Sequence, residues 1–168
     1  MIIVGIDPGL KGAVAILNLE NKMNWVFNIP IHPRGDIKGK NEVNFRELYL
    51  HLEPLSLIHD DVRVYLESVH AMPGQGVTSM FSMGHTFGGI RGVIASLGFP
   101  VELISPQKWK KHFGLNKDKE LSRSLAIKHF PDMAGDLKRK KDSDRAEALL
   151  IALYGSIHAE VGKQYGYI

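Results

Sequence analysis

The chain contains no cysteine among its 168 residues. This absence excludes a disulfide scaffold, a thiolate zinc site, an iron–sulfur cluster and a cysteine nucleophile. No apolar run approaches the ~18 residues of a membrane-spanning helix, and the first residues form no basic leader. We therefore expect a cytoplasmic protein without a membrane partner.

A strong net charge is also absent. The 21 Lys and Arg against 18 Asp and Glu give a formal charge of +3, and 44% of the residues are hydrophobic and 23% charged. These values are typical of an ordinary soluble globular protein. The length suits one domain with a full core, covering residues 1–168, in which 162–168 are expected to form a flexible tail.

The charge is distributed unevenly along the chain. Between Pro106 and Lys141 there are eleven Lys and Arg but four Asp and Glu, a net charge of +7, so the remainder carries −4. A basic segment of this kind suits a polyanion such as nucleic acid. Charge alone favours the plainer interpretation, a solvated, lysine-rich pair of surface helices.

Apolar runs and turn residues predict an α/β domain. Strands are expected over residues 2–6, 12–19, 24–30, 62–66 and 101–104. Helices are expected over 42–52, 77–97, 106–112, 118–130 and 142–161, with an exposed loop over 31–41. Strands early and alternating helices later predict a mixed five-stranded sheet with helices on both faces.

Four carboxylates follow strands or lie in the last predicted helix. Asp7 follows the first strand and Glu67 the fourth, so the two converge if those strands are neighbours, because ligands gather beyond the carboxyl ends of strands in an open α/β sheet. Asp144 and Glu147 lie about 60° apart around a helix and can both point at one site. Asp142 lies on another side of the helix, as a cap or an outer group.

Oxygen ligands of this kind favour a hard divalent cation, Mg²⁺ or Mn²⁺. Without a metal ion the carboxylates would repel one another and raise each other's pKa. Two such ions about 3.5–4 Å apart activate water and stabilise the leaving oxygen in phosphodiester cleavage. Taken singly, each acid also fits a helix cap or a solvated turn, so a metal site depends on all four meeting.

These motifs together resemble the RuvC-type Holliday junction resolvases of the RNase H-like superfamily, in the version found in phages. The resemblance spans residues 2 to about 155. Its motifs are GIDPG at 5–9, LESV at 66–69, SPQKWKK at 105–111 and DRAEALLIA at 144–152.

The resemblance implies an RNase H-like fold and a metal site built by Asp7, Glu67, Asp144 and Glu147, holding two Mg²⁺ ions, or Mn²⁺. Asp7 would bridge the two ions. The cellular family usually has Asp where this chain has Glu147, whose longer arm can alter the metal spacing. Asp142 is therefore kept as an alternative metal ligand.

The resemblance also implies DNA contacts. Basic residues of the family fall near Lys119 and near Lys108, Lys110 or Lys111, and a stacking aromatic falls near His70, whose role stays open. Family members act as dimers, and the small-residue face of the helix over 77–97 is the candidate dimer surface.

The two tryptophans receive different expectations. Trp25 is expected in the core, whereas Trp109, flanked by lysines, fits packing and DNA contact equally well.

The function implied is a Mg²⁺-dependent endodeoxyribonuclease of the crossover-junction type, acting on branched DNA as a homodimer, in the host cytoplasm if a phage encodes it. A broader nuclease for flaps, forks or RNA–DNA hybrids is a second interpretation. The third is an inactive DNA-binding protein on the same fold, against which the complete set of four acids argues.

Overall fold

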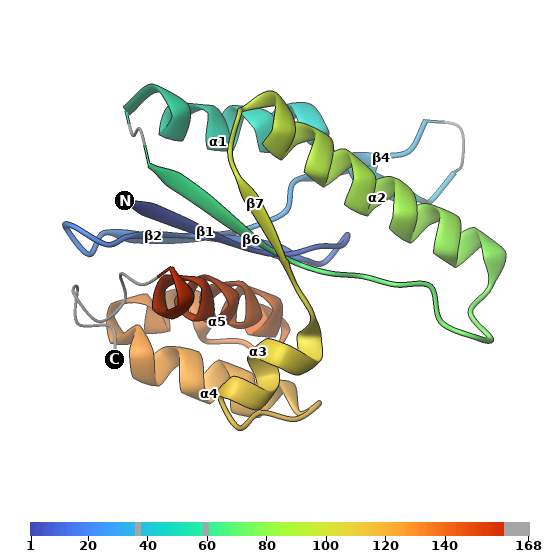
Figure 1. Cartoon of the computed structure of the whole chain (residues 1–168). Coiled ribbons are helices and arrows are strands. Elements are labelled where there is room, and N and C mark those ends of the chain that lie inside the picture. The colour runs from blue at the N-terminus through green and yellow to red at the C-terminus, as the bar shows by residue number, and fades with distance from the viewer. Residues whose placement is uncertain (36–37, 59–60, 160–168) are drawn as a thin grey trace.

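The structure is a computed structural model that describes residues 1–35, 38–58 and 61–159. A five-stranded mixed sheet lies at its centre, in the order β3-β2-β1-β6-β7. β1 pairs antiparallel with β2 and parallel with β6, and β6 pairs parallel with β7 (Figure 1). The strands are β1 (Ile2–Asp7), β2 (Ala13–Asn18), β3 (Asn24–Asn28), β6 (Val62–Glu67) and β7 (Val101–Ile104).

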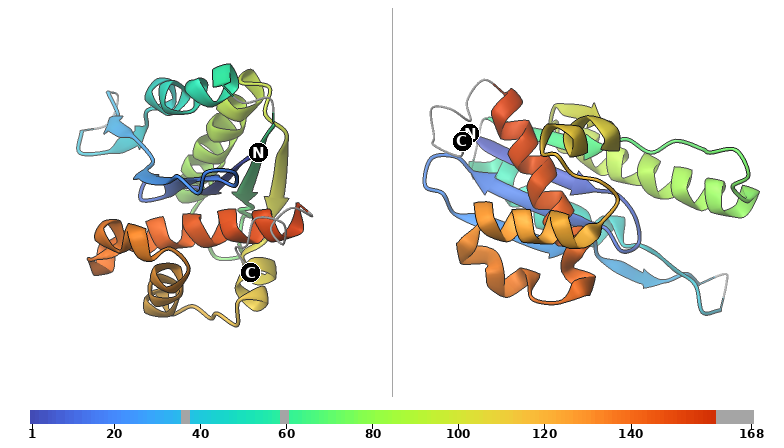
Figure 2. Two further views of the ribbon diagram at one scale, coloured as in Figure 1. Left: turned by 90° about the vertical axis from the view of Figure 1, so that its left-hand side faces the viewer. Right: turned by 90° about the horizontal axis from the view of Figure 1, so that it is seen from below.

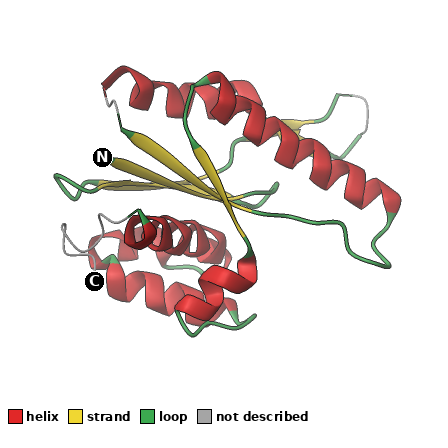
Figure 3. Ribbon diagram, in the orientation of Figure 1, coloured by secondary structure: helices red, strands yellow, loops and turns green. Residues whose placement is uncertain are grey.

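Helices cover both faces of this sheet. α1 (Phe45–Ile58) and α2 (Val77–Ser96) lie on one face, and α5 (Ser143–His158) packs directly on the other (Figures 1 and 3). α3 (Pro106–His112) and α4 (Lys119–His129) lie on the outer side of α5, as Figure 2 shows from two directions. The short helices η1 (Pro131–Leu137) and η2 (Lys140–Asp142) connect α4 to α5.

The central strand β1 is buried on both faces because it contributes to two separate hydrophobic clusters. Ile2, Val4 and Ile6 pack with residues of α1 and α2, whereas Ile3 belongs to the cluster around α5. This alternation is the two-residue period of a strand. It explains why the opening apolar run has no polar position before its last residue.

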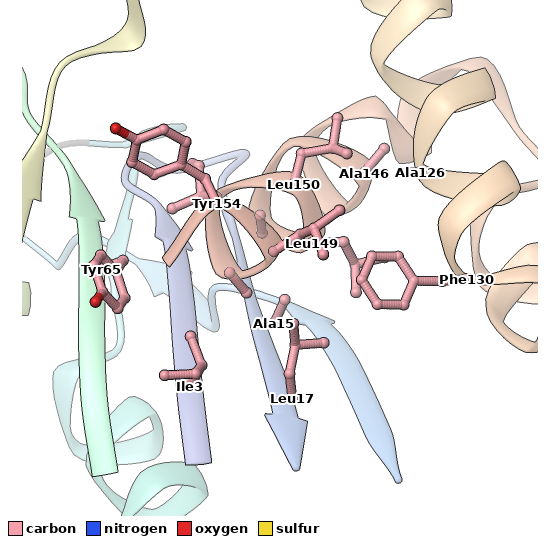
Figure 4. Packing of buried hydrophobic residues seen from close by; sticks show 14 of the residues in the cluster. Ile3, Ala15, Leu17, Tyr65, Ala126, Phe130, Ala146, Leu149, Leu150 and Tyr154 are labelled. Atoms are coloured by element: carbon pink, nitrogen blue, oxygen red, sulfur yellow. The ribbon is translucent and has the colours of Figure 1, made fainter. Parts of the chain in front are cut away.

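α5 is buried along most of its length, between the sheet on one side and α4 on the other. Leu149, Leu150 and Tyr154 are among the residues that fill this space (Figure 4). The helix approaches β1 closely at Gly5, where a Cβ atom would lie 2.4 Å from the Ala148 carbonyl oxygen. Glycine at this position therefore sets the distance between α5 and the strand that ends in Asp7.

The predicted α/β architecture is confirmed, including the five strands and the helices on both faces. The prediction of a plain loop over residues 31–41 is wrong. Its two ends form a small hairpin, in which β4 (Ile31–Pro33) pairs with β5 (Asn41–Val43). Val43 anchors the hairpin because its side chain is buried in the cluster under α1 and α2.

The helix expected over residues 42–52 begins later and runs further, as α1. Asn44 precedes it and accepts a hydrogen bond from the Glu47 backbone N–H, which is the arrangement of an N-cap. The last helix is described as far as His158, and the tail predicted over 162–168 lies outside the described residues. Within the part of the chain that the structure describes, no helix is long and apolar enough to cross a membrane.

Candidate active site

The parallel pairing of β1 and β6 brings two of the predicted acids together. Ile6 pairs with Leu66, so the next residues along the two strands, Asp7 and Glu67, end neighbouring strands at the same edge. The expectation that these two strands are neighbours is confirmed. Burial of both strand bodies fixes the backbone from which the two carboxylates project.

The first turns of α5 bring the other two acids to this edge. Carboxylate oxygens of Asp7, Asp144 and Glu147 all lie within 4.8 Å of one another. Glu67 is outside this tightest group, although its charge acts on Asp7. Three strand-end and helical carboxylates therefore meet as the sequence pattern predicted, and Glu67 lies beside them.

Burial and neighbouring negative charges make ionisation of Asp7 and Glu67 unfavourable. The pKa of Asp7 is raised well above its ordinary value, first by burial and then by the charges of Glu67, Glu147 and Asp144. The pKa of Glu67 is raised mainly by burial. Where neighbouring negative charges raise the pKa of an acid, a bound cation reduces the repulsion between the carboxylates, so such a group of acids is suited to binding a cation.

Two of the predicted DNA-binding lysines lie against the carboxylates. Lys110 Nζ lies 2.8 Å from Glu147 Oε1, and Lys119 Nζ forms an ion pair with Asp144 and lies 3.9 Å from Glu147 Oε2. Burial lowers the pKa of Lys119, but the hydrogen bond to Asp144 and the nearby negative charges outweigh it and raise the pKa overall. These ammonium groups offset the repulsion between the acids.

The other predicted DNA contacts are not part of the carboxylate group. Lys108 and Lys111 are exposed on α3, and His70 is exposed between β6 and α2. Their positions leave them accessible to a large ligand.

Trp109 has a role that the sequence left open. Its side chain is fully buried, and its Nε1–H donates a 2.7 Å hydrogen bond to Glu67 Oε2. Lys110 Nζ lies 5.0 Å from the centre of its rings. Trp109 therefore packs in the core and at the same time orients an acid of the site. The prediction that Trp25 lies in the core is wrong, because Trp25 is 45% exposed on the edge strand β3.

Asp142 is not placed as a substitute ligand. Its carboxylate is buried and accepts hydrogen bonds from the Arg139 side chain and from the Arg139 backbone N–H. These bonds lower the pKa of Asp142, which keeps it charged and paired with Arg139. It stands at the N-cap position of α5 without a side-chain hydrogen bond to the helix. Asp144 and Glu147 are therefore the acids that α5 presents.

The donor set fits a divalent metal ion. Asp7, Asp144 and Glu147 offer carboxylate oxygens, which are the ligands that Mg²⁺ and Mn²⁺ prefer. Ser122 donates a 3.4 Å hydrogen bond to Glu147 Oε1 and so helps to hold that acid in place. No local sequence pattern indicates this contact, since it depends on α4 packing against α5.

By its fold, the chain is similar to structures of RuvC from Thermus thermophilus. One, of T. thermophilus RuvC in complex with Holliday junction substrate, gives a TM-score of 0.60 at 17% sequence identity and covers 95% of both chains. A second Thermus thermophilus RuvC structure gives 0.55 at 19% identity, over 95% of this chain and 96% of the other. The chain thus has the α/β RNase H-like fold of RuvC, which confirms the fold that the motifs implied.

A relative found by sequence agrees with this likeness. Over 92 residues, 54% of this chain, the sequence is 34% identical to the protein described as Holliday junction resolvase MOC1, chloroplastic, of Chlamydomonas reinhardtii. The matched stretch spans 10% of that relative's length. No family model matches the chain. Both comparisons support the resemblance to RuvC-type resolvases.

Proposed function

We propose that the protein is a structure-selective DNA endonuclease that resolves four-way (Holliday) junctions. The observation that carries the proposal is the meeting of Asp7, Asp144 and Glu147 oxygens within 4.8 Å at the carboxyl ends of β1 and β6, on a RuvC fold. The printed name of the algal relative and the junction substrate bound by T. thermophilus RuvC support four-way junctions as the substrate.

Asp7, Glu67, Asp144 and Glu147 would hold the metal, which we propose to be two Mg²⁺ ions, with Mn²⁺ as a substitute. Divalent ions bound there supply a nucleophile at neutral pH and offset the charge that develops on the phosphate. Asp7 ends the central strand β1, and the charges of Glu67, Glu147 and Asp144 all act on it. It is therefore the residue whose removal should disturb the site most.

The chain's own groups position the DNA. The Lys119 side chain is about half exposed and lies at the rim of the carboxylates. From there its ammonium group can exchange its ion pair with Asp144 for one with a phosphate oxygen of the DNA. Lys110 lies deeper, against Glu147. Together with Lys108 and Lys111 they make affinity fall as salt rises, because cations that bind phosphates release counterions.

A homodimer would place two such sites on opposing strands of a junction, whose arms are related by approximate two-fold symmetry. The candidate surface remains the small-residue face of α2. Gly84 and Gly88 are exposed there, and a Cβ at either position would meet open space. A second chain can therefore approach the α2 backbone closely.

We place the protein in the cytoplasm, as the sequence predicts.

A nicking panel tests this proposal. The protein is incubated with Mg²⁺ and a mobile four-way junction, a flap, a linear duplex or an RNA–DNA hybrid. Selective cutting of the junction supports resolution, and equal cutting of all the substrates would instead support a broader nuclease. Binding of the junction without any cutting would show an inactive DNA-binding protein.

Asp7→Asn is the matched control for this panel. It keeps the size of the side chain and removes its charge. We expect this variant to bind the junction and not to cut it, and retained cutting would remove Asp7 from the mechanism.

A further inference from the structure

Arg145 is a cation beside the carboxylates that does not pair with them. It directly follows Asp144 in the first turn of α5, but its guanidinium group bonds to none of the four acids of the site, all of which the structure describes. The Arg145 side chain is 23% exposed, and its Nε–H donates a hydrogen bond to Asn28 Oδ1. This bond turns the arginine towards β3, which Asn28 ends.

Asn28 lies at the same edge of the sheet as the acids. Asn28 pairs with Ala13, and Ala13 pairs with Asp7, so the three residues form one row across neighbouring strands. Two strand spacings, about 10 Å, therefore separate the backbones of Asn28 and Asp7. Since Asn28 accepts a hydrogen bond from Arg145, the guanidinium group is held at the carboxylate edge, on the side away from β6 and Glu67.

The hydrogen bonds of Arg145 orient its guanidinium group without using all of it. Nη1 donates a 3.4 Å hydrogen bond to the backbone carbonyl of Asp136, in addition to the bond from Nε to Asn28. Among the described residues, Nη2 has no hydrogen-bond partner. A guanidinium group has five N–H donors in a fixed plane, so the remaining donors are available to a ligand.

Two acids lie near this arginine, and neither holds its charge firmly. Asp136 Oδ1 lies 3.8 Å from Nη1, and the Asp136 side chain is 53% exposed. An exposed ion pair of this kind contributes little to stability. The charge of Arg145 acts on Asp142, but that carboxylate is bonded to Arg139. Arg145 can therefore exchange Asp136 for a phosphate, which a guanidinium group can bind with two parallel hydrogen bonds.

We propose that Arg145 binds a phosphate of the cut DNA strand, close to the phosphate that is cleaved, and that Asn28 orients it for this contact. For the identity of its ligand this inference rests on the proposed nuclease function. A DNA strand that crosses the carboxylates along this edge of the sheet passes Arg145 on the side of β3. Lys110 reaches the acids from α3, which directly follows β7 at the other end of the sheet. The strand would then be held on both sides of Asp7.

The alternative is a purely structural role. The bond from Arg145 to Asn28 joins residues 117 positions apart and by itself ties α5 to β3. The two roles differ in how DNA binding depends on salt. A cation that binds a phosphate releases counterions, whereas a bond within the protein does not. The salt dependence of DNA binding therefore separates the two roles.

Arg145→Gln tests the contact through binding alone. Affinity for a labelled four-way junction is measured by fluorescence anisotropy between about 50 and 200 mM salt, in EDTA so that the DNA stays intact. Arg63→Gln is the matched control. Arg63 also lies near an aspartate, with 3.6 Å between Arg63 Nε and Asp61 Oδ1, and it is near the start of β6, whose other end carries Glu67.

Arg145→Gln should reduce the slope of log affinity against log salt by about 1 and weaken binding about tenfold. Arg63→Gln should change both much less. Arg145→Lys keeps the charge but loses the paired donors, so it should keep the slope and weaken binding about threefold. Asn28→Ala keeps the guanidinium group and removes its orientation, so it should behave as Arg145→Lys does. Melting temperatures measured in parallel show whether each variant is folded.

Lower melting temperatures of Arg145→Gln and Asn28→Ala, with the wild-type salt slope in both, would assign a structural role and overturn the inference. Equal changes of slope in Arg145→Gln and Arg63→Gln would also overturn it, because total charge would then explain both. If Arg145→Gln does not fold, Arg145→Lys gives the answer: wild-type affinity overturns the inference, and weaker binding at the wild-type slope supports it.

The nicking panel is independent of this test. If the wild type cuts no substrate while Arg145→Gln still loses its salt slope, the proposed nuclease function fails and the DNA contact stands. If the wild type cuts the junction while Arg145→Gln keeps the wild-type slope and affinity, the nuclease function stands and the inference is overturned.

Discussion

Trp109→Phe removes the indole N–H that donates to Glu67 and keeps an aromatic ring in the same buried position. The 2.7 Å bond has the length of a hydrogen bond to a charged acceptor, and such bonds contribute about 1.5–3 kcal/mol. The smaller ring leaves space in a fully buried position, which costs about 1 kcal/mol more. The melting temperature should therefore fall.

The functional effect should be larger than the loss of packing alone implies. Groups that hydrogen-bond a metal ligand commonly change metal affinity or activity about 10- to 100-fold. We expect the Mg²⁺ concentration for half-maximal nicking by Trp109→Phe to rise by that factor. The pKa of Glu67 is raised by burial and lowered by Trp109. Without the N–H it rises further, so the acid limb of the pH–rate profile should move to higher pH.

Nicking of a junction across a Mg²⁺ titration and across pH is the assay. Trp25→Phe is the matched control, because Trp25 is 45% exposed on β3, which is two strands away from the strand β1 that carries Asp7. It should leave both profiles unchanged. If Trp109→Phe lowers the melting temperature but leaves the Mg²⁺ midpoint and the pH profile as in the wild type, Trp109 only packs, and the reasoning is refuted.

Three further variants probe the site and its scaffold. Burial and nearby acids raise the pKa of Asp7, so the folded protein binds a proton on the Asp7 carboxylate more tightly than the unfolded chain does. Without metal, the free energy of unfolding should therefore fall as the pH rises above the ordinary Asp range. In EDTA, Asp7→Asn should therefore have a higher melting temperature than the wild type at neutral pH, and this difference should close towards pH ~4. Added Mg²⁺ should raise the melting temperature of the wild type more than that of the variant, and equal increases would argue against a metal site. Lys119→Met removes the cation paired with Asp144, so calorimetry should show tighter Mg²⁺ binding in the absence of DNA, and weaker binding would contradict that pairing. Gly5→Ala would place a Cβ 2.4 Å from the Ala148 carbonyl oxygen and should cost about 3 kcal/mol or more in chemical denaturation, whereas a neutral result would mean that α5 can move away from β1.

The parts of the fold predicted from sequence are those with a strong hydrophobic signal. β1 and β6 are short apolar runs that end in an acid, and the residues of both are buried except at a few positions. The hairpin of β4 and β5 was missed because its three-residue strands are mostly exposed and one contains Pro33. α1 continues through the exposed Pro54 because Leu52 and Leu55 bury on either side of it.

The site was predictable as far as its acids and no further. Asp7 and Glu67 follow from strand ends, and Asp144 and Glu147 from helical spacing. The bond from Trp109 to Glu67 joins residues 42 positions apart, because α3 packs beside the sheet edge. No local pattern encodes such a contact. Trp25 was misassigned for a related reason: its aromatic character suggested the core, but β3 is an edge strand.

The most direct measurement is nicking of a labelled mobile four-way junction in Mg²⁺ by the wild type and by Asp7→Asn, with junction binding measured in parallel. The wild type should cut opposing strands of the junction in preference to a linear duplex, and the variant should bind equally well without cutting. Cutting by Asp7→Asn, or a wild type that binds the junction and cuts nothing, would contradict a metal-dependent resolvase built on these four carboxylates.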